Sequence, residues 1–300
     1  MKKYIFIIGI ILVIFVGGYL VTKNAPSMDH MMGHQPIAQS HPTYSLKFTS
    51  QTTNLQPNQQ ITITYTIVDE KGNILKDFAL DHTKLMHFIV VRKDLQDFQH
   101  IHPDFNKDTG EFTIPVTFPE NGTYRLFADF TPANGQKDAQ GNILGVTPYQ
   151  DVNIGDISHY TPQAVTPDSQ STKTVGEFQI TYLLPSQVKI GTSTTMKLSV
   201  AKNGQAVTGM QQYLGAIAHG ILLKQDSLDF AHLHDMGMGD MGSMQGMNMQ
   251  DMNMGNANIT NTGPDISFNY TFPSSGIYKL FTQFQESGNV ITTDYTLQVQ

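Results

Sequence analysis

Apolar and polar residues alternate in short stretches along most of the chain, and this alternation predicts strands. Period-two patterning is typical of strands with one buried face, and Gly and Asn clusters between such stretches mark turns. Turn residues of this kind stand at 71–73 and 203–205. We therefore expect an all-β protein. The clearest inward-facing positions are Ile61, Ile63, Tyr65 and Ile67 in the first half and Met196, Leu198 and Val200 in the second.

An internal duplication sets the expected domain organisation. Residues 86–102 align without a gap with 218–234, with 7 of 17 positions identical, and residues 117–130 align with 271–284, with 8 of 14 identical. The offsets are 132 and 154 residues, so the second copy carries an insertion of 22 residues. Aromatic residues repeat as well and are expected in the cores: Phe98 and Phe230, Tyr124 and Tyr278, Phe127 and Phe281.

Each copy has about seven or eight expected strands, which favours a Greek-key β-sandwich of the immunoglobulin or cupredoxin type. The predicted organisation is an N-terminal membrane-spanning helix followed by two tandem sandwiches. Its segments are a signal anchor at 1–22, a tether at 23–43, a first sandwich at 44–155, a linker at 156–175 and a second sandwich at 176–300, with the insertion at 235–256.

The N-terminal segment predicts the compartment. Lys2 and Lys3 precede an apolar stretch at 4–21, which is just long enough to span a bilayer. The residues that follow this stretch lack the small-x-small pattern of a signal-peptide cleavage site. We therefore favour a retained anchor, with cleavage and secretion as the alternative. Because the lysines stay inside, both alternatives place the body of the protein outside the cytoplasm.

Three histidines recur at equivalent positions in both copies, and their spacing predicts a metal site in each. In an H-x-H pair the two imidazoles share one face of a strand, and a hairpin would bring the third beside them. Three imidazoles can hold copper or zinc, and the alternative is a structural cluster. The repeated Asp97 and Asp229 are expected to shape turns rather than orient an imidazole, and the unrepeated His82 and His159 are expected on the surface. The triads are His87, His100 and His102 in copy one and His219, His232 and His234 in copy two.

The insertion is rich in methionine, spaced by Gly, Asp, Asn and Gln. Eight of the fifteen methionines lie in it, and its glycines disfavour a helix. Exposed thioethers are soft ligands that select Cu(I), so we interpret the run as a metal-collecting loop, the alternative being a low-complexity segment. Its methionines are Met236, Met238, Met241, Met244, Met247, Met249, Met252 and Met254.

The tether contains the same ligand types and is a candidate auxiliary binding patch, the alternative being a polar spacer. The absence of cysteine excludes disulfides, thiolate metal sites and a blue-copper centre, which needs a Cys ligand. A net charge of −7 without a basic stripe argues against nucleic acid as a partner. The candidate ligands of the tether are His30, Met31, Met32 and His34.

The anchor, the H-x-H strand ends and the Met-Gly-Asp run at 235–256 together resemble the extracytoplasmic copper-binding domains of the CopC and YtkA-like type. The resemblance implies an immunoglobulin-like or cupredoxin-like sandwich that binds copper, here duplicated. CopC-type proteins use a histidine at the mature N-terminus, and no such histidine is evident here. The resemblance therefore implies the fold and the type of metal, but it does not identify individual ligand residues.

These observations predict a membrane-anchored, extracytoplasmic protein that captures, stores or hands over copper and is not an enzyme. The Met run would take Cu(I), and the triads would take Cu(I), Cu(II) or zinc. The expected partners are copper ions, the membrane and a copper-transporting protein. The alternative is a metal-independent surface interaction or adhesion module, in which the Met run is a contact surface.

Overall fold

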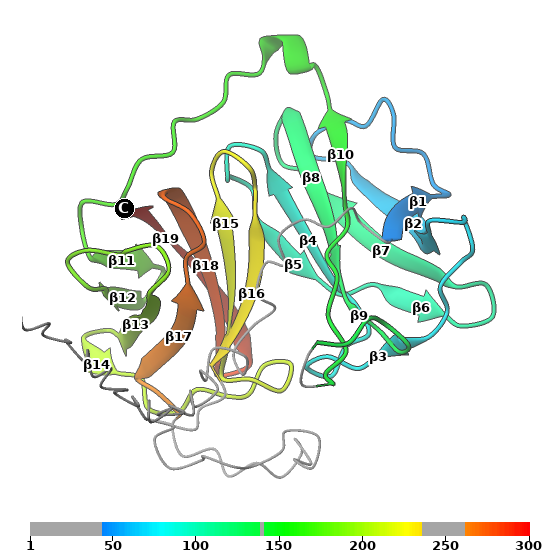
Figure 1. Ribbon diagram of the computed structural model, residues 1–300. Coiled ribbons are helices and arrows are strands. Elements are labelled where there is room, and N and C mark those ends of the chain that lie inside the picture. Colours follow the sequence, from blue (N-terminus) through cyan, green and yellow to red (C-terminus); the bar gives the residue numbers. More distant parts are fainter. Residues whose placement is uncertain (1–43, 139–140, 236–261) are drawn as a thin grey trace, which may run out of the picture.

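The computed structural model describes residues 44–138, 141–235 and 262–300, in which two β-sandwiches stand side by side (Figure 1). The predicted anchor at 1–22, the tether at 23–43 and all eight methionines of the insertion lie outside these residues. Within the described ranges there is no helix long and apolar enough to cross a membrane.

The first sandwich consists of two four-stranded antiparallel sheets and a short two-stranded ribbon. The outer sheet has the order β1 (Tyr44–Phe48), β2 (Gln60–Asp69), β7 (Glu111–Thr117), β6 (Asp104–Asn106). The inner sheet has the order β10 (Tyr149–Ile154), β8 (Gly122–Asp129), β4 (His87–Arg92), β5 (Gln99–Ile101). The ribbon pairs β3 (Phe78–Ala79) with β9 (Thr131–Pro132).

The second sandwich repeats this plan. Its outer sheet joins β11 (Thr172–Val175), β12 (Phe178–Leu183), β13 (Ser193–Lys202) and β14 (Gln205–Ala206), and β17 (Asp265–Thr271) also pairs with β13. Its inner sheet has the order β16 (Phe230–Asp235), β15 (Ala218–Lys224), β18 (Gly276–Glu286), β19 (Asn289–Val299). The short 3-10 helix η2 (Ile157–His159) lies between the sandwiches, and β11 lies within the predicted linker, so the second sandwich begins at Thr172.

Both sandwiches are immunoglobulin-like. The orders of the first sandwich correspond to the A-B-E-D sheet and the C-F-G sheet of that fold. Each copy also has a tyrosine corner: the Tyr124 hydroxyl donates to the carbonyl of Glu120 at 3.0 Å, and the Tyr278 hydroxyl donates to that of Ser274 at 2.9 Å. The Met-rich insertion occupies the place in the chain that β6 has in the first copy, between β16 and β17.

Strand β4 shows why some strands lack an alternating pattern. All six of its residues are buried, whereas β7 alternates between buried and more exposed positions. Phe88 and Val90 pack into the core of the first sandwich, while Ile89 and Val91 pack against the second sandwich. A strand that is covered on both faces reads as a continuous apolar run. Strand β15 is buried in the same way.

The inner sheets face each other and enclose a third hydrophobic cluster between the two sandwiches (Figure 1). Phe98 stacks on Phe281 with ring centroids 4.2 Å apart, and Phe230 packs on Phe127 at 5.2 Å. These four residues were expected in the cores, and the structure places them in the interface instead. The buried members of the cluster are Ile89, Val91, Leu95, Phe127, Val165, Ile221, Leu223, Leu228 and Phe281.

The polar contacts at the edge of this interface are also paired between copies. Arg125 donates to the carbonyl of Ser227 at 3.3 Å, and Lys279 donates to that of Leu95 at 3.0 Å. Arg125 and Lys279 are equivalent by the 154-residue offset.

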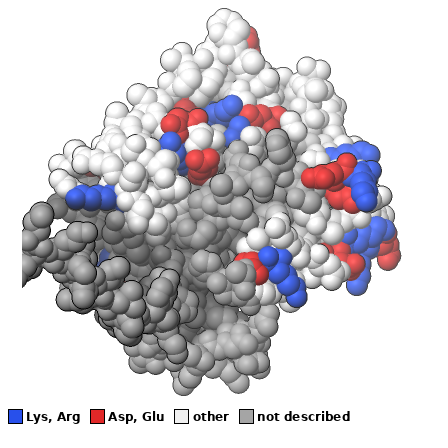
Figure 2. Space-filling view, in the orientation of Figure 1, with Lys and Arg blue, Asp and Glu red and all other residues white. Residues whose placement is uncertain are grey.

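On the face shown in Figure 2, basic and acidic side chains of the described residues lie next to one another.

Candidate metal centre

The β4–β5 hairpin assembles the first histidine triad. The register pairs Ile89 with His100 and Phe88 with Ile101, so His87 at the start of β4 lies opposite His102. The Nδ1 atom of His87 lies 3.0 Å from Nε2 of His100 and 3.1 Å from Nε2 of His102. The hairpin expected from the sequence therefore forms, and three imidazole nitrogens converge on one point.

The β15–β16 hairpin builds the second triad with the same geometry. The register pairs His219 directly with His234, and Ile221 with His232. The Nδ1 atom of His219 lies 3.2 Å from Nε2 of His232. The Nε2 atom of His234 is buried and has no hydrogen-bond partner among the described residues. A buried imidazole nitrogen without a partner is costly unless another group, such as a metal ion, takes its lone pair.

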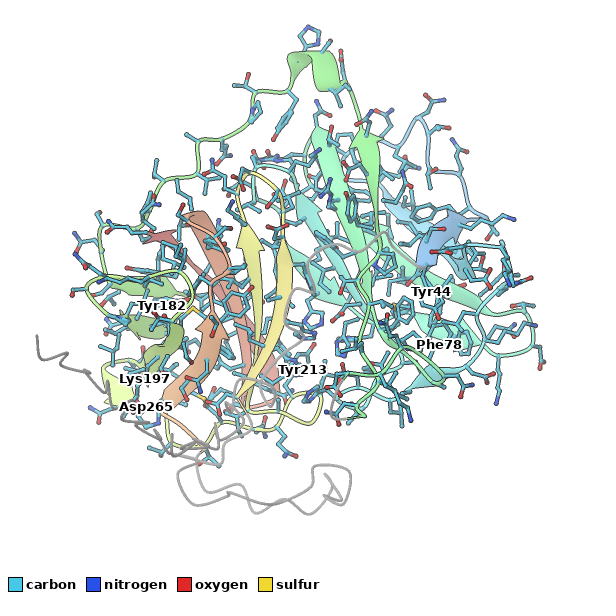
Figure 3. All side chains as sticks on the ribbon, in the orientation of Figure 1. Tyr44, Phe78, Tyr182, Lys197, Tyr213 and Asp265 are labelled. Carbon is cyan, nitrogen blue, oxygen red and sulfur yellow. The ribbon has the colours of Figure 1, made fainter. Side chains whose placement is uncertain are left out.

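Backbone carbonyls fix the orientation of the first histidine in each triad. The carbonyl of Asp81 lies 3.2 Å from Nε2 of His87, and the carbonyl of Tyr213 lies 2.9 Å from Nε2 of His219. Tyr213 is labelled in Figure 3, where it lies between the two sandwiches. Because a carbonyl only accepts, Nε2 must carry the proton in both rings, and the lone pair of Nδ1 points into the triad.

Side chains of the opposite sandwich fix the middle histidine. The Nδ1 atom of His100 lies 2.9 Å from Oε1 of Gln283, and Nδ1 of His232 lies 2.9 Å from Oδ2 of Asp129. If Nδ1 donates in each contact, the lone pair of Nε2 faces the other imidazoles of its triad. Metal-binding histidines characteristically donate their second N–H to such an outer acceptor.

Burial keeps these imidazoles neutral. It lowers the pKa of His102 and of His219 to about 3. Burial, reinforced by the neighbouring imidazoles, lowers the pKa values of His100, His232 and His234 well below the ordinary value. Neutral imidazole is the form that ligates metals, so neither triad has to lose protons before it binds an ion at neutral pH.

Each triad brings three imidazole nitrogens close enough to share one ion. The candidate ligand atoms of each set lie within 4.8 Å of one another. Nitrogen ligands about 2.0–2.1 Å from one copper or zinc ion stand roughly 3.3–3.6 Å apart in tetrahedral or trigonal geometry. The separations of 3.0 Å and 3.1 Å from Nδ1 of His87 are a few tenths of an ångström shorter, so the rings would move slightly apart around an ion. The ligand type suits copper or zinc, and the arrangement leaves one coordination position open.

Three residues of the site were missed by sequence reasoning. His82, expected on the surface, stacks on His234 with ring centroids 3.5 Å apart and an interplanar angle of 22°. Asp129 and Gln283 occupy equivalent positions of the repeat but differ in type, so they do not stand out as a repeated pair in the sequence. His159 is 82% exposed, as expected.

The repeated aspartate of the first hairpin has a structural contact. Asp97 lies 3.0 Å from Nη1 of Arg92, and its Oδ2 lies 2.8 Å from the hydroxyl oxygen of Tyr124, which shares its proton between Asp97 and Glu120. Its backbone is in the left-handed region, with φ 52°. It therefore shapes the hairpin turn, and a different carboxylate, that of Asp129, contacts a triad imidazole.

A protein family matches both sandwiches of this chain. The family described as "Domain of unknown function (DUF8832)" matches residues 40–143 and 173–300, which include all six triad histidines. The chain belongs to the DUF8832 family. Its description assigns no activity, and no curated protein matches the chain.

Solved structures match this DUF8832 protein only at low identity and low TM-score. A mutant Salmonella alpha-2-macroglobulin is 10% identical, with a TM-score of 0.24, over 87% of this chain and 15% of its own length. Native E. coli alpha-2-macroglobulin is also 10% identical, with a TM-score of 0.25, over 88% of this chain and 14% of its own length. The D00-D0 domain of Intimin is 12% identical, with a TM-score of 0.20, over 86% of this chain and 99% of its own length.

Proposed function

We propose that this DUF8832 protein is an extracytoplasmic copper-binding protein, held at the membrane by segment 1–22, that captures copper and hands it to a copper-transporting partner. The observation that carries the proposal is the pair of triads, in which five of the six imidazoles are buried and the neutral rings of each triad direct their nitrogens at a common point. Neutral nitrogens that face each other without a proton between them repel, and a cation at that point removes the repulsion.

The Met run favours copper over zinc as the cargo. Its first methionine, Met236, follows His234 after a single residue. Thioethers select Cu(I), whereas imidazoles suit copper in both oxidation states and also zinc. We therefore assign capture of Cu(I) to the Met run and the tether, and firmer binding to the triads. Labile thioether ligands permit handover by ligand exchange, and no catalytic step is proposed.

The test is a titration of the full chain with Cu(I), Cu(II) and Zn(II) in competition with chelators. Changing the eight methionines at 236–254 to serine should abolish the Cu(I) sites of the run and leave the imidazole sites. Replacing His219, His232 and His234 by alanine should remove one Cu(II) or Zn(II) site. The exposed His159→Ala variant is the matched control and should bind like the parent chain.

Two outcomes would overturn the proposal. If the parent chain binds no copper in either oxidation state, the triads are structural. If zinc binds at the triads and Cu(I) binding does not change in the methionine variant, capture of Cu(I) by the run is wrong and nothing favours copper over zinc as the cargo.

A further inference from the structure

The two sandwiches contact each other through reciprocal pairs of equivalent residues. Arg125 reaches the turn of the second sandwich, and its equivalent Lys279 reaches the same turn of the first. The aromatic pairs Phe98–Phe281 and Phe127–Phe230 are likewise equivalent contacts with the sandwiches exchanged. The interface therefore has an approximate twofold axis within one chain.

The same reciprocity includes the histidine triads. His100 and His232 are equivalent, and so are Gln283 and Asp129, yet each histidine contacts the acceptor of the opposite sandwich. Rings of opposite triads are as close as rings within one: His87 and His232 have centroids 4.7 Å apart, and His219 and His232 have centroids 5.4 Å apart. The six imidazoles form one cluster that spans the interface.

The twofold relation is broken at the outer acceptors. The middle histidine of the second triad contacts a carboxylate, whereas that of the first contacts an amide. Asp129 is 1% exposed, and its other oxygen accepts a hydrogen bond from Thr147 at 2.9 Å, which holds the carboxylate toward His232. A carboxylate acceptor makes the imidazole a stronger ligand than an amide does, and its buried charge is compensated when a cation binds.

His82 is a second departure from the twofold symmetry, and it too adds a contact to the second triad only. It belongs to the first sandwich but stacks on His234 of the second triad. Leu214 stands at the equivalent position of the repeat and has the same left-handed backbone, with φ 53° against 44° for His82. The turn is thus retained in both copies, but only the first places an imidazole against the opposite triad.

From these contacts we propose that the two triads form one interdomain metal unit with unequal sites, in which Asp129 of the first sandwich makes His219, His232 and His234 the tighter site. The proposal rests on metal binding by the triads, as proposed above. It adds that each site needs the opposite sandwich in place, because the outer acceptor of its middle histidine comes from there.

The experiment is a Co(II) and Zn(II) titration of the full chain, because these ions favour imidazole over the thioethers of the Met run. Co(II) absorption reports nitrogen coordination, and competition with chelators gives the two affinities. We expect two sites of different affinity. The His234→Ala variant should remove the tighter step, and the His102→Ala variant should remove the weaker one.

Reciprocal changes of the outer acceptors test the role of Asp129. Asp129→Asn should weaken the tighter site about 10–100-fold, the usual effect of losing an outer-shell partner. It should affect the other site less, because Asp129 lies opposite His87 in the register but makes its hydrogen bond to His232. Gln283→Glu should strengthen the weaker site. Because a misfolded protein does not bind more tightly, this gain of affinity keeps the test valid if Asp129→Asn is unstable.

The outcomes separate this inference from the proposed function. If the parent chain binds two ions and neither exchange alters either affinity, the asymmetry is wrong, while metal binding by the triads stands. A tighter site that is lost with His102→Ala instead of His234→Ala would also overturn the inference. If the parent chain binds neither Co(II) nor Zn(II), this inference fails, and the copper titration described above decides the proposed function separately.

Discussion

At the scale of single residues, the orientation of each imidazole decides what the triads can do. A carbonyl that accepts from Nε2 of His87 or His219 leaves only Nδ1 for the centre. His87, His100, His219 and His232 therefore each have an orientation fixed from outside the triad, so rotation of one of them cannot compensate for the loss of another.

The first prediction concerns single ligands. His219→Ala should weaken Zn(II) or Cu(II) binding at the second centre by more than the roughly 100-fold that marks the upper range for an outer-shell contact, because a direct ligand is lost. Competition with a chromophoric chelator measures the change. The His159→Ala variant is the control, since His159 is 82% exposed and hydrogen-bonded to Asp156. Equal affinities in both variants would contradict the role of His219.

At the scale of elements, β4 and β15 each serve a sandwich core on one face and the interface on the other. The two histidine hairpins start on these strands. Their side chains are therefore held by packing from both sandwiches, which explains why His100, His232 and His234 are buried although they lie near the ends of their strands.

The second prediction concerns the packing between the inner sheets. Phe281→Ala removes a ring that is 5% exposed and stacked on Phe98, and truncation of a buried Phe costs about 3–5 kcal/mol. Urea unfolding should show this loss of stability, and the two sandwiches should then unfold in two separate transitions. Val290→Ala, at a residue 41% exposed, is the control and should change stability by less than about 0.5 kcal/mol. An unchanged midpoint for Phe281→Ala would show that the interface contributes little.

The third prediction concerns the turn after β4. Burial alone would raise the pKa of Asp94, but hydrogen bonds from Arg92, the Gln163 amide and Tyr160 lower it overall. Since the folded pKa lies below the ordinary value of about 3.9, Asp94 stabilises the fold above that pH, and the contribution is lost as the pH falls through the folded pKa. Removing one partner of such a buried pair costs on the order of 3 kcal/mol.

Urea unfolding between pH 3 and 7 measures this contribution. Asp94→Asn should be less stable than the parent chain at pH 7, and the difference should shrink toward pH 3. Asp69→Asn is a control for an exposed aspartate whose pKa is also lowered, by hydrogen bonds with Asn73. A difference that stays constant with pH would assign the effect of Asp94 to its shape and not to its charge.

At the scale of the whole molecule, the sequence predicts the strands and the histidine triad of each copy, but not how the two sandwiches pack against each other. Period-two alternation and the repeat predicted an all-β chain with two sandwiches, and the spacing of His87, His100 and His102 predicted that they converge. All these features depend on contacts within one copy. The contacts of His82, Asp129 and Gln283 depend on how the inner sheets face each other, and no local pattern encodes that arrangement.

The fourth prediction is that an ion at one triad stabilises both sandwiches. In a His102→Ala chain only the second triad remains complete, and Zn(II) at about 100 times its dissociation constant should stabilise the folded state by about 2.7 kcal/mol. Because Asp129 at the end of β8 holds His232, amides of β8 in the first sandwich should exchange more slowly when zinc is bound. Hydrogen exchange of the full chain with zinc, and after its removal by a chelator, measures this.

Asp129→Asn in the same background should weaken the protection of β8 more than that of β15, because β15 carries a ligand directly whereas β8 is linked to the ion through the carboxylate. Protection confined to β15, β16 and β18 in both chains would show that the sandwiches respond independently. Protection that spreads to β8 only when Asp129 is present would instead identify this carboxylate as the group through which metal binding fixes one sandwich against the other.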